Sequence, residues 1–348
     1  MTRWRSVAYE WSRHAGLSVT LVALLALPAC GQPRPAESAI EFKVSTALGP
    51  AYPQGKAGEV WAALIRERSE GRIVVKHFPG ATLAQRDPAR EFAALRDGSA
   101  DLAVGSSQVW SAQVPALNLL SLPWLITDDS VLDLLLGGDT GSRLSAAIEA
   151  AGVVPLLITG NGLSVLASKN AVHKPADLAG LRIRVQPSPI VAQTFAALGV
   201  ATSSMSLADA RTAWANGTLD GQETSIATYA VSRMDTLGLT HLLLWQAGAD
   251  ALIFAVNRAR WEAWSEAQRQ LVRAAALEAA REARALEQRL NDGAAMARQG
   301  AIVTRLTPQG KAAFRAAVGS VYSTWTPVIG EDLVHDAQAA IDAAQRQR

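Results

Sequence analysis

The chain has 348 residues, of which 33 are basic and 31 acidic, so its formal net charge is +2 at pH 7. A balance so close to neutral provides no basic field of the kind that attracts nucleic acid. The length exceeds what one hydrophobic core usually organises, and two domains are therefore expected.

Residues 1–29 have the pattern of an export signal. Arg3, Arg5 and Arg13 precede a short apolar run from Leu17 to Leu27. That run cannot span a bilayer stably, because a spanning helix needs about 20 residues. We therefore expect a cleaved signal peptide over residues 1–29. Its removal takes away three basic residues and one acidic residue, which leaves 30 of each and a formal net charge of zero.

The signal ends in Leu27-Pro28-Ala29-Cys30-Gly31, which resembles a lipobox, although Pro28 replaces the usual small or β-branched residue. Cys30 is the only cysteine of the chain. An intramolecular disulfide, a cysteine-cluster metal site and a CxxC redox pair are therefore excluded. We expect lipid on Cys30 to hold the protein at a membrane, with residues 30–38 as a flexible tether. The alternative is ordinary cleavage after Ala29, which leaves a free thiol.

The next segments alternate between strand and helix patterns. Strands are expected over residues 40–44, 73–78 and 102–105, with one helix opening after Tyr52 and another starting at Arg90. This β-α-β-α-β order implies parallel strands joined by right-handed crossovers.

A second domain is expected to begin near Gly160. Its predicted strands cover residues 164–167 and 182–185, and its predicted helices cover residues 174–178, 191–198 and 206–215. The apolar stretch 252–256 is expected to return to the first domain as a buried strand.

A long helix is expected after Ser265, which forms a capping box with Gln268. Residues 266–297 contain no proline, and no glycine before Gly293. Thirty helical residues would measure about 45 Å at about 1.5 Å per residue, so this helix is expected to run along both domains. A strand over residues 302–304, a helix opened by Thr307 and Pro308, and a last helix that includes residues 329–333 follow.

Arg184 interrupts an otherwise apolar run in the predicted strand 182–185. Its planar guanidinium can bind a carboxylate through two parallel hydrogen bonds and stays charged at every relevant pH. Because it lies between Ile183 and Val185, it points away from them, either into a cleft or into solvent. Arg182 would share its face by alternation, unless Arg182 bends away or lies at the start of the strand.

The stretch Leu181 to Ser188, read with Ala197-Leu198-Gly199 and Gly217-Thr218-Leu219-Asp220-Gly221-Gln222-Glu223, resembles the periplasmic solute-binding proteins of TRAP transporters (DctP family). Phe78-Pro79-Gly80, Gly98 to Leu102 and Leu120 to Leu125 resemble the family's N-terminal half. The resemblance covers residues 38–345. It implies an α/β, two-lobed periplasmic-binding-protein fold with a ligand cleft between the lobes and a long helix spanning both. Lobe I would comprise residues 39–160 and 250–289, and lobe II residues 161–249 and 290–345.

The resemblance also implies a function. Such a receptor captures a small organic acid in the periplasm and delivers it to the membrane permease subunits of the transporter, and Arg184 falls on the family's carboxylate-binding arginine. A second cleft arginine of the family falls on Ser164, and an asparagine falls on Thr224. These shorter side chains leave a clamp for one carboxylate and argue against dicarboxylates and sialic-acid-like ligands.

Other ligand-binding candidates lie near predicted strand ends: Gln108, Gln186, Trp110 and Trp245. Each tryptophan could equally well be a core residue that packs against other side chains and does not contact the ligand. Gln246 and Asp250 are further polar candidates, and Glu223 either orients Arg184 or simply starts a helix.

No catalytic motif accompanies these residues: HExxH, GxSxG, Walker A and a GxGxxG after a strand are all missing from the sequence. We therefore expect a binding protein without enzymatic activity, cofactor, metal or nucleic-acid partner. The alternatives are a receptor for a neutral or zwitterionic ligand, a binding protein of an ABC importer, and an extracytoplasmic sensor.

Overall fold

The computed structural model describes residues 39–291, 296 and 300–346. The predicted signal peptide (residues 1–29), the tether (residues 30–38) and Cys30 lie outside these residues. Among the helices of the described part, none combines the length and the apolar character needed to cross a bilayer.

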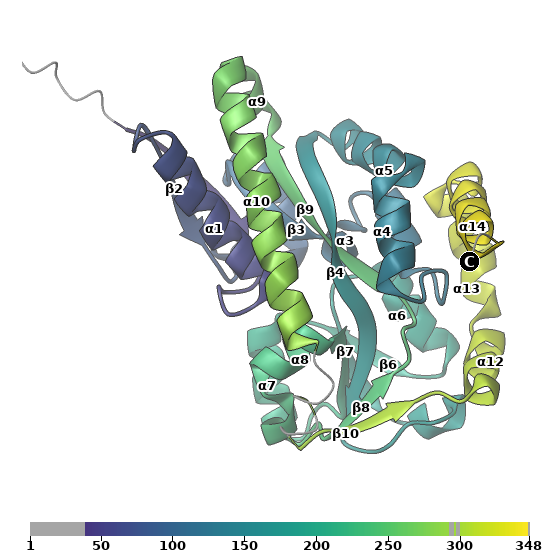
Figure 1. Ribbon diagram of the computed structural model, residues 1–348. Helices are drawn as coiled ribbons and strands as arrows, with labels where there is room; N and C mark the ends of the chain where they lie inside the picture. Colours follow the sequence, from purple (N-terminus) through teal and green to yellow (C-terminus); the bar gives the residue numbers. More distant parts are fainter. Residues whose placement is uncertain (1–38, 292–295, 297–299, 347–348) are drawn as a thin grey trace, which may run out of the picture. The chain divides into compact units, whose positions relative to one another are not determined.

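The strands join into one mixed sheet whose main path runs β2-β1-β3-β9-β4-β7-β5-β6, while β8 pairs with β4 and with β10 (Figure 1). Their bounds are β1 Ile40–Thr46, β2 Ile73–Phe78, β3 Leu102–Ser106, β4 Val153–Ser168, β5 Arg182–Val185, β6 Ala201–Ser204, β7 Gly221–Ser225, β8 His241–Leu244, β9 Ala249–Asn257 and β10 Ile302–Arg305.

The helices are α1 Pro53–Arg68, α2 Glu91–Arg96, α3 Ser107–Trp110, α4 Asp129–Gly137, α5 Asp139–Ala150, α6 Pro189–Ala197, α7 Leu207–Ala215, α8 Ile226–Ser232, α9 Arg258–Ala263, α10 Glu266–Leu290, α12 Pro308–Ala317, α13 Gly319–Ile329 and α14 Glu331–Arg346. Shorter 3-10 turns are η1 Thr82–Ala84, η2 Pro88–Arg90, η3 Pro115–Ser121, η4 Pro175–Leu178 and η5 Met234–Leu237.

The first half of the sheet has the predicted topology. Strand β1 pairs in parallel with both β2 and β3, which confirms the β-α-β-α-β unit. Strand β9 pairs antiparallel with β3, so the chain does return to the first half as predicted.

Strand β4 links the two halves of the sheet and is longer than predicted. It begins at Val153 instead of near Ser164, and it pairs first with β9 and then with β7 and β8. Irregularities between Pro155 and Leu157 and between Gly160 and Leu163 interrupt its register with β9. Bulges of this kind absorb the proline and glycines that would otherwise break a strand. The chain therefore passes from one lobe to the other within a continuous strand.

Helix α10 has 25 residues, so it ends earlier than predicted, at about 38 Å from its start. The predicted capping box is present, because Ser265 Oγ accepts from the Gln268 backbone and Gln268 Oε1 accepts from the Ser265 backbone. The buried face of the helix is mostly alanine, which lets α1 approach closely. Because α10 also contacts β4 and α8, it reaches both halves of the sheet (Figure 1).

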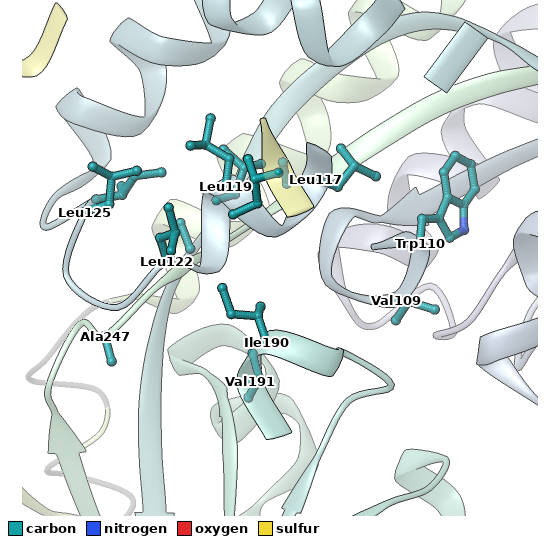
Figure 2. Close-up of a cluster of buried hydrophobic side chains, with 14 of the residues drawn as sticks. Val109, Trp110, Leu117, Leu119, Leu122, Leu125, Ile190, Val191 and Ala247 are labelled. Carbon is teal, nitrogen blue, oxygen red and sulfur yellow. The ribbon is translucent and has the colours of Figure 1, made fainter. Parts of the chain in front are cut away.

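The largest apolar cluster joins segments that are far apart in the sequence. Figure 2 shows leucines of the segment after α3 near Ile190 and Val191 of α6, with Trp110 in the same cluster. A second cluster lies where α1 and α10 pack against β1, β3 and β9. Burial of these side chains supplies the main driving force for folding and holds the strands of the sheet in place.

Candidate functional site

A cavity of ≈ 40 Å³ lies where the two halves of the sheet meet, and most of its lining is polar. Its polar residues come from both sides: Gln54, Ser106, Gln108, Asn161, Ser164, Arg184, Gln186, Glu223, Thr224, Ser225, Thr228 and Asp250. Strands β5, β6 and β7 run parallel to one another, and ligands of such sheets bind beyond the carboxyl ends of the strands. The structure thus brings together five of the predicted site residues: Arg184, Gln186, Ser164, Thr224 and Gln108.

Arg184 is buried, with 5% of its surface exposed, and it is the one cation among the described residues that line the cavity. Its Nε and Nη2 donate to the Met205 carbonyl at 3.0 and 2.8 Å, which fixes the guanidinium. Burial lowers the pKa of Arg184 to about 10, and the nearby Glu223 carboxylate opposes this shift. The side chain therefore remains a cation at neutral pH. Within the described part of the chain, the hydrogen bonds of the guanidinium are those to Met205, so its other N–H groups can bind an anion.

Arg182 lies at the start of β5, which is one of the two arrangements that we expected would keep it apart from Arg184. It is exposed and donates to Asp220 through Nε at 2.8 Å. It does not line the cavity.

Glu223 faces the same cavity from β7 and is 3% exposed. Burial raises the pKa of its carboxyl to about 7, the negative charge of Asp250 adds to the effect, and Gln108 and Arg184 oppose it. Its Oε1 accepts from Gln108 Nε2 at 3.4 Å, and its Oε2 has no hydrogen-bond partner within the described residues. Near neutral pH this group is therefore able either to donate or to accept a proton.

Gln108 connects the two sides of the cavity. Its Oε1 accepts from Gln186 Nε2 at 2.8 Å, while its own Nε2 reaches Glu223. Gln108 belongs to α3, whereas Gln186 directly follows β5. The two amides therefore form a polar bridge across the cavity.

Asp250 is held by a set of donors. Its Oδ1 accepts from Ser106 Oγ, Ser107 Oγ and the Gln108 backbone at 2.8, 2.9 and 3.2 Å, and its Oδ2 accepts from Asn161 Nδ2 at 2.9 Å. These donors keep the carboxylate in place without a cation from the described residues. Asp250 thus orients the start of α3, which carries Gln108.

Ser164 and Thr224 occupy the positions where the family resemblance led us to expect an arginine and an asparagine. Both are buried and line the cavity. Ser164 Oγ accepts from the Gly248 backbone at 3.1 Å, so this position anchors β4 to the residue before β9 instead of supplying a charge.

A smaller, mainly apolar cavity of ≈ 20 Å³ adjoins the first. Trp245, Ala247, Val191 and Phe195 supply its apolar walls, and Gln108, Ser164 and Glu223 line both cavities. Trp245, a predicted site residue, lies here. We call this space the side chamber.

Trp110 does not line either cavity and instead packs in the core, fully buried against Phe92 with ring centroids 5.2 Å apart. The cause lies in β3: a Cβ atom at Gly105 would come within 2.0 Å of the Trp110 ring. The absent side chain at Gly105 makes the space that the indole fills. The sequence candidate Gln246 likewise lines a different surface hollow.

Several cavity residues were missed by sequence reasoning. Ser106 is the N-cap of α3, Gln54 lies in the first turn of α1, and Asn161 lies in β4 at the register irregularity between Gly160 and Leu163. Val191 and Phe195 have the spacing expected of core residues, and both do belong to the hydrophobic core. No local signal separates such residues from structural ones.

Among the described residues, no group of three or more His, Cys, Asp or Glu side chains is placed to hold a metal ion. The cavity offers a fixed guanidinium, amides, hydroxyls and a carboxyl that titrates near pH 7. This set is suited to holding a small polar anion by hydrogen bonds.

Two lobes joined by a shared sheet, with a polar cavity between them that contains one buried arginine, define a binding protein of the periplasmic receptor type. The sequence profile of the DctP family, described as bacterial extracellular solute-binding protein, family 7, matches residues 44–326. The chain belongs to this family, which confirms the predicted resemblance and the predicted fold.

The chain is similar to a TRAP periplasmic solute-binding protein from Ralstonia eutropha H16 whose crystal structure holds (S)-2-acetolactate. The two are 43% identical with a TM-score of 0.84, and the match covers 87% of this chain and 99% of that one. A "solute-binding protein" of Chromohalobacter salexigens is 31% identical over 68% of this chain and 70% of its own length. An uncharacterised protein y4mM of Sinorhizobium fredii is 31% identical over 66% of this chain, but the match spans 42% of the relative's length.

Proposed function

We propose that this protein is the periplasmic receptor of a TRAP-type transporter and that it captures a small monocarboxylic acid through Arg184. The observation that carries the proposal is the position of this guanidinium, buried at the meeting point of the two lobes and fixed on Met205. A buried cation is costly unless it is paired. A bound carboxylate would supply the strongest partner available to it.

The charges around the cavity favour one carboxylate over two. Arg184 is the one cation among the described lining residues, whereas Glu223 and Asp250 are both acidic. A second ligand carboxylate would therefore meet acidic groups without a counter-ion. The Ralstonia eutropha relative, with its bound 2-hydroxy-3-oxo acid, supports a monocarboxylate for this chain as well.

A zwitterionic ligand is the second candidate, because an ammonium group could approach Glu223 and Asp250. Asp250 already accepts four hydrogen bonds, so it does not require a cationic partner. This favours a hydroxy acid, and paired titrations with a 2-hydroxy acid and the matching 2-amino acid distinguish the two.

The test of the carboxylate site is calorimetry with a panel of small acids first screened by thermal shift, since a ligand that binds only the folded state raises the melting temperature. Arg184→Ala should weaken binding by about 2–5 kcal/mol, which is roughly thirtyfold to several-thousandfold. Arg184→Lys should also bind poorly, because an ammonium cannot reproduce the two parallel hydrogen bonds. Arg182→Ala is the matched control and should keep the wild-type affinity. Wild-type affinity in Arg184→Ala would refute the carboxylate site.

We further propose that the protein binds its solute without transforming it and that its lobes close on the ligand. The proposed lobes are those expected from the sequence, residues 39–160 with 250–289 and residues 161–249 with 290–345, except that α14 contacts α4 and α5 of lobe I. Small-angle scattering should then show a smaller radius of gyration in saturating ligand. The same ligand should be recovered chemically unchanged after long incubation.

Lipid attachment at Cys30 and delivery to membrane permease subunits complete the proposal. The lipobox-like Leu27 to Gly31 sequence supports the anchor. Cys30→Ala should release the protein from membranes, and mass spectrometry of the native protein should show a lipid-modified N-terminal cysteine. A wild type that fractionates as a soluble protein would exclude the anchor.

A further inference from the structure

The side chamber has features that the carboxylate site does not use. Its apolar walls come from Val191 and Phe195 of α6 and from Trp245 and Ala247 in the segment between β8 and β9. Ser121 and Thr194 also line it, but their hydroxyls donate to the Ala249 and Ile190 carbonyls. The Trp245 indole N–H is the buried donor of the chamber that has no partner among the described residues. It meets the main cavity at three shared polar residues, Gln108, Ser164 and Glu223. A ligand held by Arg184 in the main cavity therefore has an apolar recess next to the polar groups at its other side.

We propose that the side chamber receives a short alkyl substituent of the bound acid, so that it selects 2-hydroxy acids with a methyl or ethyl branch. This inference rests on the proposed function and adds the feature that the ligand must carry. In this arrangement the carboxylate pairs with Arg184, the hydroxyl meets Gln108 and Glu223, and the alkyl group enters the chamber.

The size of the chamber sets the length of the branch. A cavity of ≈ 20 Å³ has room for about one water-sized group. A methyl group or the end of an ethyl group fits this space, and a branched four-carbon chain does not. A carboxymethyl group would carry a charge into a space where no described lining residue is a cation and Glu223 is acidic.

Neighbouring side chains hold the walls of the side chamber in place, so the chamber accepts only substituents that fit its present volume. The ring centroids of Phe195 and Trp245 lie 5.3 Å apart, and Phe314 packs edge-on against Trp245 with ring centroids 6.0 Å apart. Trp124 donates its indole N–H to the Trp245 carbonyl at 2.9 Å and fixes the backbone. Close packing of this kind resists the shifts that a larger substituent would need.

The test is calorimetry of the wild-type protein with glycolate, lactate, 2-hydroxybutyrate, 2-hydroxy-4-methylpentanoate and malate. Affinity should rise about fourfold for each added methylene from glycolate to 2-hydroxybutyrate, which corresponds to ~0.8 kcal/mol per buried methylene. It should fall for 2-hydroxy-4-methylpentanoate and for malate.

Two substitutions in the chamber wall make the test specific. Val191→Phe fills the chamber and should bring the ratio of 2-hydroxybutyrate to glycolate affinity close to one. Phe195→Leu makes room and should raise the affinity for 2-hydroxy-4-methylpentanoate relative to lactate. Ala196→Val, at an exposed position of the same helix outside both cavities, should leave these ratios unchanged. Melting temperatures identify any variant that fails to fold.

The outcomes separate this inference from the function on which it rests. Equal affinities for glycolate and 2-hydroxybutyrate, with no effect of Val191→Phe on their ratio, would refute the chamber and leave the carboxylate site intact. If no acid of the series binds while another acid of the thermal-shift panel does, the inference is wrong and the carboxylate site stands. If no acid of either set binds, the carboxylate function is itself wrong.

Discussion

The side-chain amide of Gln186 donates to the side-chain oxygen of Gln108 at 2.8 Å, and this bond joins the end of β5 to helix α3. Gln108 in turn reaches Glu223, so three side chains form one connected path across the cavity. The path links the two halves of the sheet at the place where the proposed ligand would lie. Its members are therefore placed to couple ligand binding to the position of the lobes.

Gln186→Ala should loosen this connection. Removing one neutral hydrogen bond costs about 1 kcal/mol, which corresponds to a roughly fivefold weaker affinity. The ligand-free variant should also show a larger radius of gyration by small-angle scattering, because a bond between the halves is missing. Gln338→Ala is the control, since that exposed glutamine bonds to Asp342 of its own helix and, among the described residues, to no group near the cavity. An unchanged affinity and radius in Gln186→Ala would show that the bridge does not contribute to closure.

Ligand affinity should depend on pH through Glu223. Burial raises the pKa of this carboxyl to about 7. Below pH 7 it is mostly protonated and can donate to the ligand, whereas above pH 7 its negative charge joins that of Asp250 beside the bound anion, with Arg184 as the opposing charge. Affinity should therefore fall as the pH rises from 6 to 8.5.

Calorimetry in buffers of different ionisation enthalpy measures the proton uptake that accompanies binding near pH 7. Glu223→Gln should remove both the uptake and the pH dependence, while exposed Glu282→Gln on α10 should keep them. A wild-type affinity that stays constant over this range would contradict a titrating role for Glu223.

The stability of the fold should decrease as the pH rises, because of a second buried carboxyl. Glu91 is fully buried with Ser45 Oγ donating to it at 2.9 Å, and burial raises its pKa from 4.5 to about 7. Between these two pKa values the native state binds a proton that the unfolded state has lost. The free energy of unfolding therefore falls as the pH rises from about 4.5 through about 7, by at most about 1.4 kcal/mol per pH unit for one group.

Urea denaturation at pH 5, 6, 7 and 8 measures this slope. Glu91→Gln keeps the acceptor for Ser45 and should flatten part of the slope, and the double variant with Glu223→Gln should flatten most of it. A stability of Glu91→Gln that falls with pH as steeply as that of the wild type would contradict the assignment.

The sequence was sufficient to predict the strands and helices whose pattern depends on neighbouring residues alone. Alternation placed Arg184 on the face opposite Ile183 and Val185 but left cleft and solvent open, and the resemblance to the DctP family was needed to assign it to the ligand site. The length of β4 could not be predicted in the same way, since Pro155 and Gly160 normally mark breaks and only the pairing with β9 shows that bulges absorb them.

The side chamber could not be predicted for a different reason. Val191 and Phe195 stand four residues apart on α6 and read as core positions, which they are. Their second role depends on Trp245 lying opposite them, and tertiary packing alone decides that relationship. Binding sites generally consist of such side chains gathered from separate elements of a common fold.

Trp110 was expected near the ligand and lies in the core, which yields a last prediction about Gly105. A Cβ atom at position 105 would come within 2.0 Å of the rigid indole, so either the ring or strand β3 must shift. Overpacking of this kind costs about 1–3 kcal/mol, and Gly105→Ala should lower the melting temperature accordingly. Gly137→Ala is the matched control, because a Cβ there meets nothing within 4 Å.

Trp110→Phe should relieve the clash, so the double variant should be more stable than the sum of the two single changes predicts. Trp110→Phe alone should leave the affinity for the acid unchanged, because the indole lines neither cavity. A large loss of affinity in Trp110→Phe at wild-type stability would return this residue to the ligand site, and additivity of the two stability changes would show that Gly105 and Trp110 are not coupled.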